Sequence, residues 1–401
     1  MKKNHLMNTP LEVKFCKKCV ESNLRFIGSA QHRDQKGDLK QRTLFSEDRV
    51  CSACLYYEQK NKINWKEREK ELADIFDQYR SNNDEYDVLV PGSGGKDSRY
   101  LSDVIKNKYK MNPLSCTWAP HMYTDVGWRN FQSWIATGLD NQLFTPNKTI
   151  HKKLTYLSFK NLLHPFQPFV MGQFYFPIRV ALEKNIKLII YGDSYAERGL
   201  GGNLHTASNS FNPALYTYKS KKDLFFGGES LEELKKFKIY EKDLIPYIPL
   251  KENLVSDAKL KLLQLPYFLN YNPQSNYYYS IQNTNFEVNP DGRTEGTYTK
   301  YASLDDKIDG LHHYTWFIKT GRGRATEDAA IEVRNNIITR EEAVSLVKKY
   351  DGEFPKKYFR EILEYLDINE QEFTDIIDSF RPEGLWKKNN GKWELKHAVW
   401  K

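Results

Sequence analysis

Apolar residues in the middle of the chain alternate between a helical period and short continuous runs. Residues 64–79 begin with a capping-box pattern and continue with an apolar stripe at helical spacing, which predicts a helix. Four short apolar runs predict buried strands; they cover residues 86–90, 114–118, 142–145 and 187–191. Helical patterns separate these runs. Because strands that alternate with helices form parallel sheets with helices on both faces, the expected fold class is α/β with a parallel sheet.

Three regions of different character predict three parts of the chain. Residues 1–63 hold four of the five cysteines and show little periodicity, with a polar loop at residues 28–42. Residues 64–230 carry the alternating pattern of an α/β domain. Residues 231–401 are mainly helical and interrupted by prolines, and we expect this region to contact a substrate or a partner.

Composition narrows the class of protein only slightly. With 401 residues, 40% of them hydrophobic and 28% charged, the chain has the profile of a globular protein of two or three domains. A net charge of +8 fits an enzyme that handles anions as well as a weak nucleic-acid binder. No apolar run reaches the roughly 18 residues of a membrane span, and the first residues lack the apolar segment of a signal peptide. Five cysteines are too few for a disulfide scaffold. We therefore expect a cytoplasmic protein without a membrane partner.

The sharpest motif is Ser93-Gly94-Gly95-Lys96-Asp97-Ser98, which follows a predicted strand and opens a predicted helix. Glycines let the backbone bring its N–H groups to an anion, and a helix N-terminus adds partial positive charge. Lys96 adds a full charge, and the hydroxyls of Ser93 and Ser98 can donate to phosphate oxygens. Asp97 fits such a loop if it caps the helix or holds Mg²⁺ against the phosphates. The ordinary P-loop pattern is absent, because Asp97 follows Lys96.

A second acidic pair follows the predicted strand 187–191. Asp193 and Glu197 lie where the carboxyl end of that strand would meet the phosphate loop. They can share Mg²⁺ or position a reacting group; the alternative is an ordinary surface turn followed by a helix start.

Two Cys-x-x-Cys pairs, Cys16/Cys19 and Cys51/Cys54, predict a metal site. Four thiolates suit a structural Zn²⁺, and the polar segment 28–42 accounts for the long spacing between the pairs. An iron–sulfur cluster or unrelated thiols are the alternatives.

Three arginines are candidates for binding an anionic substrate. Arg322 and Arg324 lead into a predicted helix N-terminus, a place that suits a carboxylate or phosphate, although a solvated turn explains them too. Arg179 lies in an apolar helical stretch, where we expect either a carboxylate partner or an anionic ligand.

The loop resembles the PP-loop of the ATP pyrophosphatase superfamily (adenine nucleotide alpha hydrolase-like enzymes), which cleave ATP between its α and β phosphates. Together with the cysteine pairs and three further motifs, it resembles the bacterial N-acetyl sugar amidotransferases of lipopolysaccharide O-antigen, pseudaminic and legionaminic acid pathways, including flagellin glycosylation. These motifs are F-P-I-R at 176–179, G-R-G-R-A-T-E-D-A at 321–329 and I-T-R-E-E-A at 338–343. The departures are the long spacing between the cysteine pairs and Asp193, where the resemblance leads us to expect Glu.

The resemblance implies an ATP-dependent enzyme that converts the acetamido group of a bacterial surface sugar to an acetamidino group and releases AMP and pyrophosphate. Its cofactors would be ATP, Mg²⁺ and a structural Zn²⁺. Because four cysteines are assigned to metal and only Cys116 is spare, we expect ammonia to come from a separate pair that resembles a glutaminase and a cyclase. The alternative is a PP-loop enzyme of tRNA thiolation. No cluster of basic and aromatic residues marks an RNA surface, so we expect no nucleic-acid partner.

Overall fold

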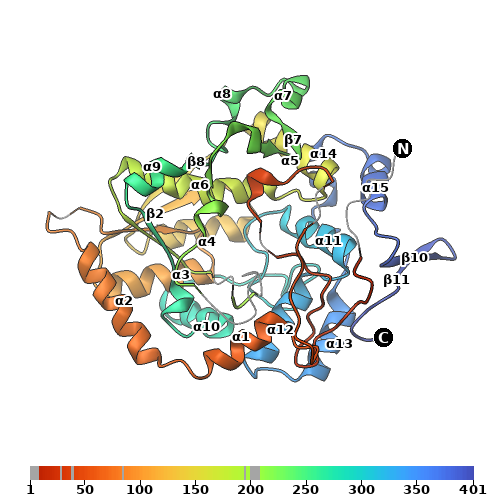
Figure 1. Cartoon of the computed structure of the whole chain (residues 1–401), viewed down its shortest axis with the longest axis horizontal. Helices are drawn as coiled ribbons and strands as arrows, with labels where there is room; N and C mark the ends of the chain where they lie inside the picture. The colour runs from red at the N-terminus through yellow and green to blue at the C-terminus, as the bar shows by residue number, and fades with distance from the viewer. Residues whose placement is uncertain (1–8, 28, 38–39, 84, 194–195, 199–207) are drawn as a thin grey trace.

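A five-stranded parallel sheet forms the centre of the computed structural model, which describes residues 9–27, 29–37, 40–83, 85–193, 196–198 and 208–401 (Figure 1). Its strand order is β3-β2-β1-β4-β9. The strands are β1 (Val88–Pro91), β2 (Pro113–Trp118), β3 (Asp140–Phe144), β4 (Leu188–Tyr191) and β9 (Lys261–Gln264). The predicted α/β class is therefore confirmed, with four strands within a few residues of their predicted places. The sequence pattern missed β9, a short strand beyond residue 230.

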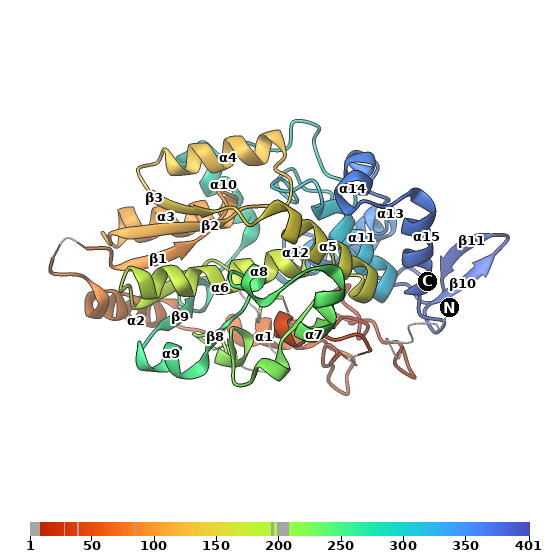
Figure 2. The same ribbon diagram turned by 90° about the horizontal axis from the view of Figure 1, so that it is seen from above.

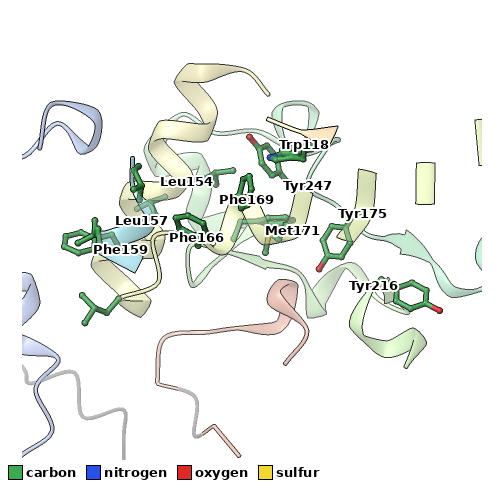
Figure 3. Close-up of a cluster of buried hydrophobic side chains, with 14 of the residues drawn as sticks. Trp118, Leu154, Leu157, Phe159, Phe166, Phe169, Met171, Tyr175, Tyr216 and Tyr247 are labelled. Atoms are coloured by element: carbon green, nitrogen blue, oxygen red, sulfur yellow. The ribbon is translucent and has the colours of Figure 1, made fainter. Parts of the chain in front are cut away.

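Alternate residues of the strands point into two different cores. Leu89 and Ile189 face one core, whereas Val88, Val90 and Leu188 face the other. Successive side chains of a strand point to opposite faces, so a continuous apolar run is buried on both. The larger core is filled by aromatic and aliphatic side chains of α5 (Lys148–Leu162) and α6 (Gln167–Glu183), which Figure 3 shows around Trp118 and Tyr247.

Helices cover both faces of the sheet (Figure 2). Helix α6 packs on β1, β2 and β4, and the opposite core contains residues of α2 (Trp65–Tyr79) and α3 (Lys96–Asp103). The helix predicted from residue 64 has Asn64 as its cap, accepting a hydrogen bond from the Glu67 backbone N–H. The other longer helices of the first three-quarters of the chain are α1 (Ser52–Lys60), α4 (Asp125–Ile135) and α10 (Pro273–Asn283).

The last part of the chain is mainly helical and packs against the cysteine-rich region. Its helices are α11 (Asp309–Thr320), α12 (Arg324–Arg334), α13 (Arg340–Tyr350), α14 (Phe359–Leu366) and α15 (Glu370–Ser379), followed by the hairpin of β10 (Trp386–Asn389) and β11 (Lys392–Leu395). Small apolar residues of α12 and α13 share one core with the four cysteines. In both views the N-terminal segment lies beside these helices (Figures 1 and 2). This contact brings the first and last parts of the chain together.

Short elements lie between β4 and β9, and the stretch 231–244 projects from the body in Figure 1. They are β5 (Thr217–Tyr218), β6 (Phe225–Phe226), β7 (Glu229–Ser230), α7 (Leu231–Leu234), α8 (Glu241–Leu244), β8 (Leu250–Lys251) and α9 (Glu252–Asp257). None of the helices among the described residues is both long enough and apolar enough to cross a bilayer.

Candidate active site

The phosphate loop connects the carboxyl end of β1 to the N-terminus of α3, as the sequence predicted. Gly94 has a φ of 86°, and a Cβ on this residue would lie 2.7 Å from the Asn130 carbonyl oxygen. Only glycine fits that backbone conformation in that space. The Ser98 hydroxyl accepts a hydrogen bond from the Gly94 N–H and donates one to the Gly95 carbonyl oxygen, at 3.2 and 2.9 Å. The loop is therefore a fixed turn at a helix N-terminus.

The two charged residues of the loop hold each other. Lys96 Nζ lies 2.5 Å from Asp97 Oδ2, and the Asn276 amide donates to Asp97 Oδ1 at 2.9 Å. Burial raises the pKa of Asp97, but the Lys96 ammonium and these hydrogen bonds outweigh it and hold the pKa below its ordinary value. Asp97 is thus a carboxylate at neutral pH, the form that binds a divalent cation.

A buried arginine supports the loop from behind. The Arg99 side chain is fully buried, and its Nε donates to the Gly94 carbonyl oxygen at 2.8 Å while Nη2 donates to the Asn130 carbonyl oxygen at 2.5 Å. Sequence reasoning did not single out this residue. It ties the loop to α4.

A cavity of about 650 Å³ lies above the loop, within the range of ~300–1,000 Å³ usual for ligand sites. Its floor includes Ser93, Gly95, Lys96, Asp97 and Ser98, together with residues at the carboxyl ends of β1, β2 and β4. In open parallel sheets, ligands bind outside the carboxyl ends of strands on either side of the point where strand order reverses. Here that point is between β1 and β4, so the cavity occupies the expected position.

The wall opposite the loop comes from residues that the sequence reasoning missed. Ser93 Oγ donates a hydrogen bond to Asp305 Oδ2 at 2.5 Å, across 212 residues of sequence. Tyr301, Ser303 and Asp309 line the same cavity. Burial and the neighbouring Asp309 raise the pKa of Asp305 to about 6, although the Ser93 hydrogen bond opposes the shift. No motif marks Asp305, because its importance comes from packing against a loop that is distant in sequence.

Of the predicted substrate residues, Arg324 lines the cavity and forms an ion pair with Asp328 at 2.9 Å. Arg322 is not among the lining residues; its Nε lies 2.9 Å from Glu21, and it also pairs with Glu327. The N-terminus of α12, where we expected an anionic substrate to bind, already binds a carboxylate of the chain itself. The Asp351 carboxylate accepts hydrogen bonds from the backbone N–H groups of residues 323 and 326, at 2.9 and 3.1 Å.

Arg179 and Glu197 also lie away from the cavity lining. Arg179 Nη2 donates to the carbonyl oxygens of Ile245 and Ile248, at 2.9 and 2.6 Å, so backbone groups stand where we expected a carboxylate or a ligand. Glu197 is buried and pairs with the buried Lys60 at 2.6 Å.

Asp193 does line the cavity, and its Oδ1 lies 2.9 Å from Arg198 Nε. Arg198 also pairs with Glu327 at 2.6 Å. Asp193, Asp97 and Asp305 all line the cavity, but their carboxylate oxygens do not all lie within 4.8 Å of one another, so in the described part of the chain they do not form a closed metal site. Residues 194 and 195 of the predicted motif lie outside the described part of the chain.

The four predicted cysteine ligands converge on one buried point. All four sulfurs lie within 4.8 Å of one another, with Cys16–Cys54 at 3.8 Å and Cys19–Cys51 at 3.7 Å. A tetrahedron with metal–sulfur bonds of about 2.3 Å has sulfur–sulfur edges of about 3.8 Å. The four side chains therefore fit a four-coordinate metal. With Zn²⁺ bound, all four coordination positions would be taken by cysteine sulfurs, as in structural zinc sites. None of the four lines the cavity.

Comparison with known proteins gives one family match. Residues 295–399 match the family described as the C-terminal domain of WbpG-like LPS biosynthesis proteins. No curated protein matches the chain.

Two solved structures are among those similar to the chain. An NH3-dependent NAD synthetase from Campylobacter jejuni is 16% identical, over 46% of this chain and 78% of that one, with a TM-score of 0.28. The U34-tRNA thiolase NcsA from Methanococcus maripaludis, solved with its 4Fe-4S cluster, is 12% identical over 84% of this chain and 89% of that one, with a TM-score of 0.31. Scores this low carry no argument about this chain.

The parallel sheet, the glycine-rich loop between β1 and α3, and the cavity above it define a protein of the α/β class with a candidate anion site at the carboxyl edge of its sheet. Within that class the chain carries a WbpG-like C-terminal domain, which confirms the resemblance that the sequence motifs indicated. The region that matches begins before Asp305 and includes Arg324, so it supplies the wall that faces the loop.

Proposed function

We propose that this chain is an ATP-dependent amidotransferase that acts on the acetamido group of a bacterial surface sugar. The amide oxygen would attack the α-phosphorus of ATP, forming an O-adenylyl imidate as pyrophosphate leaves. Ammonia would then add to the imidate carbon, and loss of AMP would leave an acetamidino group. An amide carbonyl is a poor electrophile, and adenylation turns its oxygen into a good leaving group. The enzyme would work in the cytoplasm, where ATP is available.

The residues of the cavity suit this chemistry. Lys96 and the N-terminus of α3 would hold the phosphates, with the Ser98 hydroxyl fixing the loop through its hydrogen bonds to Gly94 and Gly95. Asp97, the carboxylate of the loop, would hold Mg²⁺ against the phosphates, and the ion would neutralise phosphate charge. Arg324, on the opposite wall, adds positive charge to the same cavity. Most of the catalysis would come from positioning two substrates in a site closed to water.

The observation that carries the proposal is the hydrogen bond between Ser93 and Asp305. It joins the phosphate loop to the region that matches the WbpG-like family. A substrate bound by that region would therefore lie against the phosphates, which is the geometry that adenylation of a sugar requires.

The ammonia would come from another protein. Cys116 is buried, and burial alone raises the pKa of its thiol, so it is not a thiolate nucleophile. With the other four cysteines grouped as metal ligands, the chain offers no cysteine for hydrolysing glutamine. A partner pair that resembles a glutaminase and a cyclase would supply ammonia through a path closed to water. Cys116 lines the cavity beside the loop, but the same burial and raised thiol pKa weigh against the alternative of tRNA thiolation, which needs a reactive sulfur there.

Product analysis tests the reaction. With an N-acetyl sugar, ATP and ammonium, we expect AMP and pyrophosphate in equal amounts, and the mass of the sugar should fall by about 1 Da as NH replaces O. Lys96→Met and Asp97→Asn should each lower AMP formation by at least 100-fold while the chain still folds, with a modest fall in melting temperature because each breaks the Lys96–Asp97 pair. Lys62→Met and Asp77→Asn change exposed residues of the same types and should retain full activity.

Two results would contradict this reaction. One is formation of ADP and phosphate, which means cleavage at the γ-phosphate. The other is glutamine-dependent activity of the chain alone that Cys116→Ala abolishes, since it would make Cys116 a nucleophile. We expect glutamine to support turnover only when the partner pair is added.

A further inference from the structure

A network of ion pairs joins the cysteine site to the cavity; its members are Glu21, Arg25, Asp193, Arg198, Arg322 and Glu327. The network begins two residues after Cys19, where the backbone N–H of Glu21 donates to the Cys19 sulfur at 3.4 Å. The Glu21 carboxylate accepts hydrogen bonds from Arg322 Nε at 2.9 Å and from Arg25 Nη1 at 3.1 Å. These three side chains are buried, so salt screens their pairs little. The turn that carries Cys19 therefore holds two guanidinium groups in place.

Glu327 of α12 continues the network toward the cavity. Its Oε2 lies 3.4 Å from Arg322 Nη2 and 3.7 Å from Arg25 Nη2. Its other oxygen, Oε1, accepts a hydrogen bond from Arg198 Nη1 at 2.6 Å. Burial raises the pKa of Glu327, but the three guanidinium groups outweigh burial and hold the pKa well below its ordinary value. Glu327 is therefore a carboxylate shared by three arginines.

Arg198 ends the network at the cavity. Its Nε donates to Asp193 Oδ1 at 2.9 Å, and both side chains line the cavity. Its remaining nitrogen, Nη2, donates no hydrogen bond to another of the residues that the structure describes. The charge of Arg198 also reaches the phosphate loop: burial raises the pKa of Asp97, and the Arg198 guanidinium acts with Lys96 to lower it. Two carboxylates thus hold Arg198 near the loop with one edge of its guanidinium left for a ligand.

We propose that Arg198 binds a phosphate group of ATP, and that Glu327 and Glu21 are positioning residues that hold it in place from the cysteine site. A planar guanidinium matches the geometry of phosphate oxygens, so Arg198 would complement the point charge of Lys96 on the loop. Because the side chain is held before the nucleotide arrives, binding costs less conformational entropy. This inference rests on the proposed function, since it takes the nucleotide to be ATP.

Binding calorimetry on the full, zinc-loaded chain tests the role of Arg198. The probes are α,β-methylene-ATP with Mg²⁺, which cannot be cleaved between its α and β phosphates, and adenosine, which has no phosphate. Arg198→Met should weaken binding of the ATP analogue by about tenfold or more and leave the affinity for adenosine unchanged. Arg198→Lys keeps the charge without the planar group, so it should recover part of the lost affinity. Arg129→Met removes an exposed arginine that pairs with Glu287 outside the cavity lining, and it should bind both probes normally.

Glu327→Gln and Glu21→Gln test the positioning residues, because an amide keeps the shape of the side chain and removes its charge. Each arginine of the network contacts two carboxylates, so each single variant leaves it one, and the chain should fold. Each variant should weaken binding of the ATP analogue by about threefold or more. Glu21→Gln keeps the N–H that donates to Cys19, so its zinc content should be unchanged.

Double variants distinguish positioning from a purely structural role. When Arg198→Met is already present, adding Glu21→Gln or Glu327→Gln should cause no further loss of affinity for the ATP analogue, because both carboxylates act through the Arg198 guanidinium. Losses that simply add would contradict the positioning roles.

Unchanged affinity of Arg198→Met for the ATP analogue would overturn the inference, and so would an equal loss of affinity for adenosine. AMP formation with an N-acetyl sugar and ammonium is measured separately. The expected binding results without any AMP formation would contradict the proposed reaction and keep Arg198 as a phosphate ligand. AMP formation by Arg198→Met with an unchanged kcat and an unchanged KM for ATP would do the opposite.

Discussion

Replacing Asp305 by Asn should make the chain more stable at neutral pH and less active. The Asp305 carboxyl is enclosed between the phosphate loop and α11, where it accepts a hydrogen bond from Ser93. Burial and the neighbouring carboxyl groups of Asp309 and Asp306 raise its pKa from 3.8 to about 6. A rise of about two pKa units corresponds to about 3 kcal/mol of folding free energy. An amide keeps the shape of the side chain and removes the charge.

The direction of this stability change with pH follows from when the carboxyl group binds a proton in the folded and unfolded chains. Below about pH 4 the carboxyl is neutral in both the folded and the unfolded chain, so its ionisation costs nothing. Between pH 4 and 6 it ionises in the unfolded chain first, and the folded chain loses stability as pH rises. Above pH 6 both states are ionised and the loss stays at its full value. Asp305→Asn lacks this loss, so its stability relative to the original chain should increase by about 3 kcal/mol between pH 4 and pH 7.

Chemical denaturation of the ligand-free chain at several pH values measures this difference. Asp77→Asn, at an exposed position, is the control and should show no such change. The same Asp305→Asn variant should lose at least tenfold in AMP formation, because the carboxyl group that contacts Ser93 of the phosphate loop is gone. A stability difference that stays constant within about 0.5 kcal/mol from pH 4 to pH 7 would refute the assignment of a raised pKa to Asp305. Full activity of the variant would refute its place in the site.

Two further predictions concern the metal site and the loop. Cys51→Ser should lower the zinc content from about one ion per chain to near zero and lower the melting temperature, whereas Cys116→Ser should keep the metal; equal zinc in both variants would contradict the four-cysteine site. Gly94→Ala should cost at least 2 kcal/mol of stability and most of the nucleotide affinity, because its Cβ would lie 2.7 Å from the Asn130 carbonyl oxygen. Gly391→Ala has a similar φ of 79° with nothing within 4 Å, so it should cost only about 1 kcal/mol, and equal losses would show that strain alone matters at Gly94.

The sequence by itself determined the features that depend on neighbouring residues. Four strands and the helices between them follow from apolar runs and periods, because burial on both sheet faces requires them. The phosphate loop is recognisable because strand, glycines and helix start follow one another directly. The cysteine pairs predict a shared site because each pair already has the spacing of a metal knuckle, and the structure brings all four sulfurs together.

Only the tertiary structure decided which polar residues share the cavity. Arg322 and Arg324 stand two positions apart, yet only Arg324 lines it, because Glu21, from a distant segment, pairs with Arg322. Asp305 carries no motif; it gains its position because it contacts Ser93 of the phosphate loop, some two hundred positions earlier in the chain. The cost of burying a charge and the relief given by a partner depend on what surrounds it in space. A sequence pattern describes residues that are close along the chain, whereas this cavity is lined by residues that are far apart in sequence and close in space.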